Sequence, residues 1–213
     1  HIAERHSAGW APIQGAYLRQ GEIAPEFVHP EVLPRLTDEA IKLVHSHKTE
    51  TKPFFLYLAL TAPHTPWLPT AEFAGKSEAG MYGDFVLMVD AEVGRMLEAL
   101  DQAGKSEDTL LIFTSDNGFL LGNHRLTDKV LGYEESIRVP LYIRAPGFPR
   151  QVTTRAALNN DLASTVSEFA GITPGLAVDG RSLLPLLRNP LETNWRKRFL
   201  VEYLGTVESK RNP

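Results

Sequence analysis

The chain has 213 residues, of which 43% are hydrophobic and 23% charged, an ordinary globular composition that is long enough for a substantial core. Its net charge of −4 argues against a nucleic-acid partner, and no apolar run approaches the ~20 residues that a membrane helix needs. The absence of cysteine excludes disulfides and thiolate metal sites. The short basic run 196–198 is interpreted as a solvated face.

Helices and strands are predicted to alternate along the first half of the chain. Thr37 is predicted to cap a helix with an acidic first turn. Residues 52–60 form a short apolar run that is typical of a buried strand. The clearest helix is predicted over 82–103, where apolar residues recur at helical spacing and Gly104 suits the C-terminal cap.

The second half is predicted to continue the alternation. Residues 109–114 and 139–144 are expected to be buried strands, 161–170 a short helix, and 199–203 a last strand. Repeated strand–loop–helix spacing favours an α/β fold with a mostly parallel sheet flanked by helices.

Polar side chains follow the predicted strand 109–114. Asp116 and Asn117 stand at its end, where open α/β sheets place their ligands. Carboxylate and amide oxygens suit Ca²⁺ or Mg²⁺ better than Zn²⁺. Asp-Asn-Gly is also a common turn sequence, so a purely structural turn is the alternative interpretation.

Two further stretches add candidate groups. His64 lies between Pro63 and Pro66 after the apolar run 52–60, so its ring is expected to be displayed from a stiff loop. Lys129 follows Asn117 by twelve positions, enough for the segment to fold back over a cation. A cation site beside an anion-binding group suggests an enzyme that acts on an anionic ester.

Seven short segments carry a resemblance to one known family. In chain order they are 53–66, 82–86, 114–118, 121–129, 133–141, 160–165 and 179–187. Together they resemble the C-terminal part of the catalytic domain of a type I sulfatase, in the alkaline phosphatase superfamily. Each segment alone is weak, but their order is specific. The resemblance implies an alkaline phosphatase/sulfatase-like α/β fold that is incomplete in this chain.

The resemblance also implies a role for each candidate residue. Asp116 and Asn117 match a ligand pair for one divalent cation, usually Ca²⁺. His64 matches a histidine that protonates the leaving group, Lys129 matches the lysine that binds sulfate, and His124 matches a substrate or neighbouring contact. These roles suit the chemistry, because a cation and an ammonium stabilise sulfate charge and a histidine can act as general acid.

The chain departs from the family pattern in its nucleophile. It contains no Cys-x-Pro-x-Arg or Ser-x-Pro-x-Arg motif and no adjacent aspartates, which in sulfatases provide a formylglycine and the first metal ligands. We therefore expect residues 1–213 to be a partial catalytic domain that lacks the N-terminal half with the nucleophile and has a truncated C-terminal subdomain. We expect this chain alone to be inactive, and the formylglycine to belong to the missing part.

Three functions stay open at this point. They are sulfate ester hydrolysis, phosphate or phosphonate ester hydrolysis in the same superfamily, and a non-catalytic metal- or sugar-binding remnant. Asn117, where phosphatase relatives typically carry histidine, favours a sulfatase. The expected partner is a sulfated small molecule or carbohydrate, and the resemblance implies a periplasmic, secreted or lysosomal setting.

Overall fold

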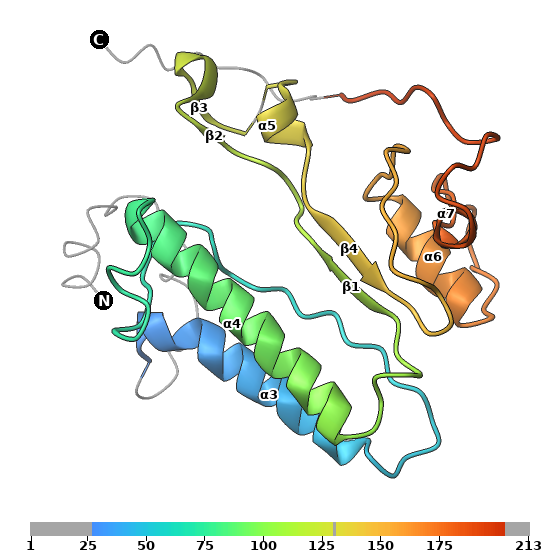
Figure 1. The fold of residues 1–213 in the computed structure, drawn as a ribbon, viewed down its shortest axis with the longest axis horizontal. Coiled ribbons are helices and arrows are strands. Elements are labelled where there is room, and N and C mark those ends of the chain that lie inside the picture. The colour runs from blue at the N-terminus through green and yellow to red at the C-terminus, as the bar shows by residue number, and fades with distance from the viewer. Residues whose placement is uncertain (1–26, 130, 203–213) are drawn as a thin grey trace. The chain divides into compact units, whose positions relative to one another are not determined.

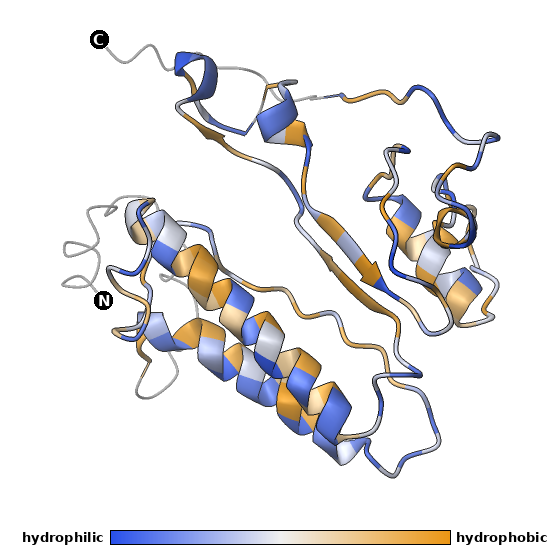
Figure 2. Cartoon of the chain, viewed as in Figure 1, coloured by the Kyte–Doolittle hydropathy of each residue, from blue (hydrophilic) through white to orange (hydrophobic). Residues whose placement is uncertain are grey.

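The computed structural model describes residues 27–129 and 131–202, which belong to two compact units, 1–106 and 107–213 (Figure 1). The first unit contains the short 3-10 helix η1 (His29–Glu31) and the helices α3 (Val32–Ser46) and α4 (Gly80–Gln102). The two long helices pack side by side. Figure 2 shows the mixed hydrophobic and hydrophilic surfaces of both.

The core of the first unit lies between α3 and α4. Buried apolar side chains at helical spacing supply it, and they are Leu33, Ala40 and Val44 from α3 and Phe85, Met88, Val89, Ala99 and Leu100 from α4. Arg95 of α4 joins the helices through an ion pair with Asp38 of α3, and it also pairs with Glu92 of its own helix at 2.7 Å. The amphipathic periodicity therefore buries one face of each helix.

The start of α3 differs from the predicted start. Thr37 is not an N-cap: it is fully buried inside the helix, and its Oγ1 donates a hydrogen bond to the carbonyl of Leu33 at 3.2 Å. The helix begins at Val32 because η1 leads directly into it. The predicted helix over 82–103 is confirmed as α4. Gly104, at φ +70°, donates to the carbonyl of Asp101, as a C-terminal capping glycine does.

The apolar run before His64 is extended but is not paired as a strand among the described residues. Its side chains alternate between partly buried and exposed, and Phe55 and Tyr57 are 73% and 81% exposed. The predicted buried strand over 52–60 is therefore wrong for this structure. The alternation is the period of a strand, without a neighbouring strand to pair with it.

The second unit has short elements and two strand pairs. In chain order they are β1 (Leu111–Thr114), β2 (Leu120–Leu121), η2 (Asn123–Arg125), β3 (Thr127–Asp128), α5 (Glu134–Ile137), β4 (Leu141–Arg144), α6 (Asp161–Phe169) and α7 (Leu184–Arg188). β1 pairs with β4, with Ile112 opposite Ile143, and β2 pairs with β3. Both described pairs are antiparallel, where mostly parallel pairing was predicted. A parallel return is usually carried by a long helix, and between β1 and β4 the described residues form only the β2–β3 pair, η2 and the four-residue α5.

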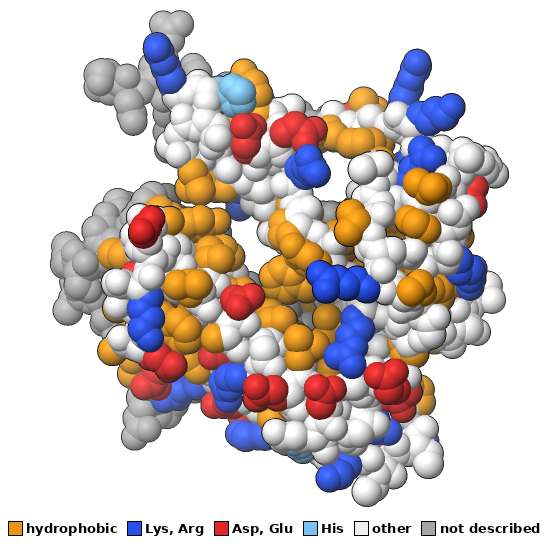
Figure 3. Space-filling view, in the orientation of Figure 1, with side chains coloured by type: hydrophobic (Ala, Val, Ile, Leu, Met, Phe, Trp, Pro, Cys, Tyr) orange, Lys and Arg blue, Asp and Glu red, His pale blue; other side chains and the backbone are white. Residues whose placement is uncertain are grey.

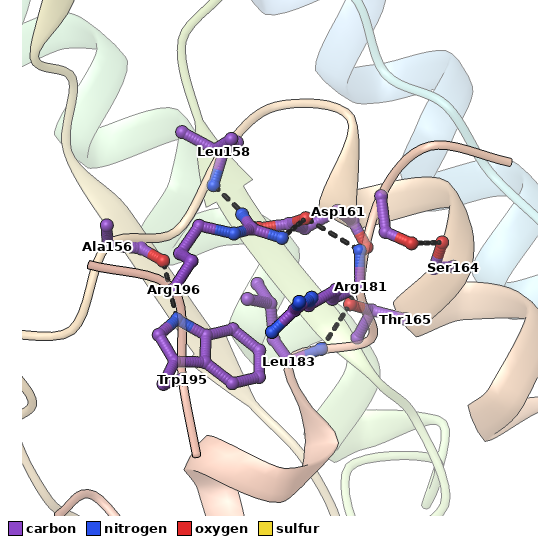
Figure 4. Close-up of polar contacts among 10 residues, drawn as sticks. Ala156, Leu158, Asp161, Ser164, Thr165, Arg181, Leu183, Trp195 and Arg196 are labelled. Carbon is purple, nitrogen blue, oxygen red and sulfur yellow. Dashed lines mark hydrogen bonds and ion pairs between the residues drawn. The ribbon is translucent and has the colours of Figure 1, made fainter. Parts of the chain in front are cut away.

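Asp161, the first residue of α6, holds the C-terminal part of the second unit together (Figure 4). Its carboxylate is fully buried and accepts hydrogen bonds from the amides of Leu158 and Arg181, both at 2.8 Å. Arg196 binds the same carboxylate with both terminal nitrogens, one of them at 2.7 Å. The interpretation of 196–198 as a solvated face is therefore wrong for Arg196, whose side chain is 10% exposed.

The remaining core of the second unit packs around Trp195. Leu183, Leu186 and Trp195 form a buried cluster, and Leu141 and Ile143 of β4 pack against it. Residues 199–202 form no strand, and Tyr203 lies outside the described residues. Hydrophobic side chains also reach the surface between charged ones (Figure 3). Within the described part of the chain, no helix has both the length and the hydropathy for a membrane crossing.

Candidate active site

The turn after β1 presents Asp116 to solvent. Asp116 Oδ1 accepts a hydrogen bond from the amide of Asn117 at 2.9 Å, and Ser115 Oγ donates to the carbonyl of Asn117 at 3.0 Å. Asn159 reaches across from before α6 and donates to the carbonyl of Asp116 at 3.0 Å. Backbone and side-chain bonds thus fix the turn. The other carboxylate oxygen of Asp116 has no hydrogen-bond partner among the described residues.

Asn117 and Lys129 meet in the second unit. Lys129 Nζ donates a hydrogen bond to Asn117 Oδ1 at 3.2 Å. The side-chain nitrogen of Asn117, Nδ2, donates to the carbonyl of Gly118 at 2.8 Å, and this bond orients the side-chain oxygen toward the lysine. The structure therefore brings together the predicted cation ligand and the predicted anion-binding group, which lie twelve positions apart in the chain.

The donor set at this turn fits part of the shell of a hard cation. Asp116 and Asn117 offer only oxygen atoms, which Ca²⁺ and Mg²⁺ prefer. In the described residues no cluster of three or more histidine, cysteine or acidic side chains could hold a metal ion. Because Ca²⁺ takes about 6–8 oxygen ligands, these two side chains alone would supply a minority of them.

His124 lies in the loop between β2 and β3, packed against the start of α5. Its Nε2 bonds to Glu135 Oε2 at 3.3 Å, and its ring stacks on Tyr133 with 4.2 Å between centroids. The same contact is an ion pair whenever His124 is protonated, with Glu135 supplied by α5. No hydrogen bond joins His124 to Asn117 or Lys129 in the described part of the chain.

Ser136 of α5 was not predicted to contribute to the site. It is 2% exposed, and its hydroxyl donates to the carbonyl of Lys129 at 2.6 Å. Its own carbonyl accepts the amide of Gly118 at 2.9 Å. A Cβ at Gly118 would lie 2.1 Å from the carbonyl oxygen of Glu135, so only glycine permits this approach. The only signal in the sequence was the position of Ser136 soon after Lys129, in segment 133–141.

His64 belongs to the first unit, whereas the other candidates belong to the second. Its side chain is exposed on the loop that follows the extended run, and its Nδ1 donates to the carbonyl of Thr65 at 2.7 Å. A carbonyl can only accept, so the proton of this bond resides on Nδ1. Nε2 is therefore the ring atom that can gain and lose a proton.

Two buried carboxyl groups, those of Asp84 and Asp161, have lowered pKa values, and the groups that lower them hold the local structure in place. The amide of Gly75, together with that of Ser77, holds the pKa of the Asp84 carboxyl below its usual value. Burial acts to raise the pKa of Asp161, but the Arg196 guanidinium and two backbone amides lower it further than burial raises it. Each carboxylate fixes a loop, so neither is a candidate for the chemistry.

The chain belongs to the sulfatase family, because the sequence profile of that family matches residues 24–172. It is 40% identical over 122 residues to the N-acetylglucosamine-6-O-sulfatase of Bacteroides thetaiotaomicron, covering 55% of this chain and 22% of that protein. It is 30% identical over 209 residues to the N-acetylglucosamine-6-sulfatase of Homo sapiens, covering 78% of this chain and 38% of that protein. The chain thus spans between 22% and 38% of the length of these two relatives.

Solved structures have the same fold. One from work on glycosaminoglycan metabolism by Bacteroides thetaiotaomicron matches with a TM-score of 0.64 at 28% identity, covering 76% of this chain and 37% of that one. One in complex with its substrate D-glucosamine-2-N,6-O-disulfate matches with a TM-score of 0.52 at 38% identity, covering 58% of this chain and 26% of that one. The phosphonate monoester hydrolase of Agrobacterium radiobacter matches with a TM-score of 0.51 at 36% identity, covering 55% of this chain and 24% of that one. These likenesses confirm the predicted α/β class of the alkaline phosphatase/sulfatase type.

Proposed function

We propose that the protein is a sulfuric ester hydrolase in which Lys129 binds the sulfate group and Asp116 and Asn117 contribute to a divalent-cation site. The contact that carries the proposal is the 3.2 Å hydrogen bond between Lys129 Nζ and Asn117 Oδ1. It supports the proposal because a sulfate held by the ammonium would also lie beside a cation bound at the turn. Membership of the sulfatase family supplies the reaction class.

The proposed cation is Ca²⁺, because the turn offers a carboxylate and an amide oxygen and no nitrogen or sulfur ligand. Bound there, a divalent cation supplies positive charge that polarises the sulfate oxygens. Lys129 adds a second positive charge, and Asn117 holds the ammonium in place through its amide oxygen. Preorganised charge of this kind stabilises the charge that redistributes as the ester bond breaks.

His64 is the proposed general acid for the leaving group. The bond from its Nδ1 to the carbonyl of Thr65 orients the ring and leaves Nε2 to carry the transferred proton. An alkoxide is a poor leaving group, so protonation of its oxygen assists bond cleavage. His124 is the proposed contact to the part of the substrate beyond the sulfate. We assign the nucleophile, by resemblance a formylglycine, to no residue of this chain.

The proposed substrate class is a sulfated carbohydrate, and 6-O-sulfated glucosamine derivatives are the first to test. Two relatives named for N-acetylglucosamine 6-sulfate and a structure with a glucosamine disulfate support this choice. The steryl-sulfatase of Homo sapiens is also similar, at 33% identity, so a steryl sulfate belongs in the same panel.

Phosphonate ester hydrolysis is the second candidate, favoured by 36% identity to the Agrobacterium radiobacter enzyme over 55% of this chain. A phosphonate monoester and a sulfate ester each carry one negative charge at neutral pH, so substrate charge does not separate the two functions and activity has to be measured on both. A paired assay of matched aryl sulfate and aryl phosphonate esters separates the two functions.

The test uses the full-length protein and three variants. Asn117→Ala should weaken Ca²⁺ binding and lower turnover together, and Lys129→Ala should lower kcat/KM by about 10²–10³-fold. Asn189→Ala, which removes an exposed asparagine beyond α7, is the matched control and should change neither. Ca²⁺ affinity is measured by calorimetry, and an unchanged affinity in Asn117→Ala would refute the assignment of Asn117 to the metal site. Greater activity on the phosphonate than on the sulfate would favour the second candidate.

A further inference from the structure

Ser136 contacts both segments that carry the proposed cation and sulfate groups. It lies in α5, one helical turn that begins five residues after Lys129. Its hydroxyl binds the carbonyl of Lys129 at 2.6 Å, and its carbonyl binds the amide of Gly118, next to Asn117, at 2.9 Å. One buried residue therefore connects the backbone at Lys129 to the backbone at the turn.

We propose that Ser136 is a positioning residue that sets where the Lys129 ammonium stands relative to Asn117. The proposal rests on the proposed function, since it assigns sulfate binding to Lys129. Nothing in it requires Ser136 to touch substrate. Ser136 acts only through Lys129, and its removal displaces the ammonium without removing it.

The physical reason lies in the length of the lysine side chain. Four flexible methylene groups separate Nζ from the backbone, so the position of the ammonium depends on where the backbone is held. Asn117 Oδ1 restrains the far end at 3.2 Å, and the Ser136 hydroxyl restrains the near end at 2.6 Å. With both ends held, little freedom is left to lose when an anion binds. A displacement of about 1 Å in such a group can lower the rate about 100-fold.

The close approach of α5 to the turn supports a precise spacing. The Cβ of any other residue at position 118 would lie only 2.1 Å from the carbonyl oxygen of Glu135. Backbone packed this tightly resists movement, so the Ser136 bonds operate between two rigid segments. A hydroxyl that only satisfied a turn would stabilise α5 but would leave the ammonium unaffected. The two roles predict different kinetics.

The experiment is a double-mutant cycle in the full-length protein. Ser136→Ala and Lys129→Ala are made singly and together, and Ser136→Thr tests whether a hydroxyl restores function. Ser164→Ala is the matched control, because that hydroxyl also donates to a backbone carbonyl of the second unit, at Gly180, 2.9 Å away. Two quantities are measured: kcat/KM for a sulfate ester, and the dissociation constant of inorganic sulfate by calorimetry.

We expect Ser136→Ala to lower kcat/KM and weaken sulfate binding by about 10- to 100-fold when Lys129 is present. In the Lys129→Ala background the same change should cost less than about twofold, because the group it positions is gone. Ser136→Thr should recover most of both quantities. Ser164→Ala should lower thermal stability without changing either.

Three results would overturn the proposal. Ser136→Ala within about twofold of wild type would show that the hydroxyl has only a structural role. Equal losses in both backgrounds would show that Ser136 does not act through Lys129. A Lys129→Ala variant that binds sulfate and turns over normally would refute the sulfate role of Lys129 itself, and this outcome identifies a failure of the proposed function. If Ser136→Ala does not fold, Ser136→Cys keeps the volume with a weaker donor and should show the same non-additivity.

Discussion

Replacing Arg196 with methionine should destabilise the second unit by about 3–5 kcal/mol, because it leaves the Asp161 carboxylate buried without its counter-charge. Asp161 has no exposed side-chain surface, and Arg196 is 10% exposed. The guanidinium contacts both carboxylate oxygens, so methionine removes two charge-assisted hydrogen bonds while keeping most of the apolar volume. Among the described residues, the amides of Leu158 and Arg181 alone remain as donors to Asp161.

The same change should alter the response to acid. The folded-state pKa of Asp161 is below its unfolded value, so its contribution to stability is complete above the unfolded value of about 3.9 and is lost as pH falls through the folded value. Without Arg196, burial acts to raise the folded-state pKa of Asp161 with less opposition. We expect acid unfolding of Arg196→Met to begin at a higher pH than in the wild type.

Urea unfolding followed by tryptophan fluorescence measures the effect. Trp195 is a local reporter, since its ring centroid lies 5.4 Å from the Arg196 guanidinium carbon and its indole nitrogen binds the carbonyl of Ala156. Arg188→Ala is the matched control: Arg188 pairs with Glu168 at 3.7 Å in an exposed position, and such pairs contribute about 0–1 kcal/mol. If Arg196→Met cost no more than Arg188→Ala, the reasoning from burial would be refuted.

Two further substitutions test the site. His64→Ala should lower kcat for alkyl sulfates by about 10²–10⁴-fold but affect a nitrophenyl sulfate far less, because nitrophenolate leaves without a proton; equal losses on both esters would exclude His64 as the general acid. Gly118→Ala should destabilise the protein by about 1–3 kcal/mol or more and weaken binding of inorganic sulfate, because its Cβ would lie 2.1 Å from the Glu135 carbonyl. Gly132→Ala, which meets nothing within 4 Å, is its control in thermal melts, and equal melting temperatures for the two would contradict the close-packing argument.

Helix α4 shows what local pattern can predict. Its apolar spacing over 82–103 predicted a helix, and the structure has one at Gly80–Gln102. Both the periodicity and Gly104 act within a few residues, so the sequence contains the whole signal. Thr37 shows the limit: a good capping residue does not begin a helix when the preceding segment is already helical. Strand pairing is less local still: β1 and β4 pair antiparallel although β2, η2, β3 and α5 lie between them in the chain, and no local pattern in the sequence indicates this pairing.

Part of the candidate site could likewise be predicted from the sequence, and part of it could not. The meeting of Asn117 with Lys129 followed from loop length and residue chemistry, which are visible in the sequence. The roles of Ser136 and Arg196 were not visible, because serine and arginine are common surface residues and only tertiary folding buries them here. Asp161 was placed on a helix correctly, but its partner is 35 positions away and no local rule connects them.

The loop that carries Lys129 also contains residues with left-handed backbone conformations. His124, Arg125 and Asp128 have φ values of 56°, 59° and 103°, and all three positive-φ residues other than glycine in the described part of the chain lie here. Each such residue costs on the order of 1 kcal/mol, because its Cβ crowds the backbone. The stack of His124 on Tyr133 and the bond from the Lys129 amide to Asp128 Oδ1 offset part of this cost. Glycine would adopt these conformations without this cost, so the three side chains place backbone strain in the loop that also carries the lysine proposed to bind sulfate.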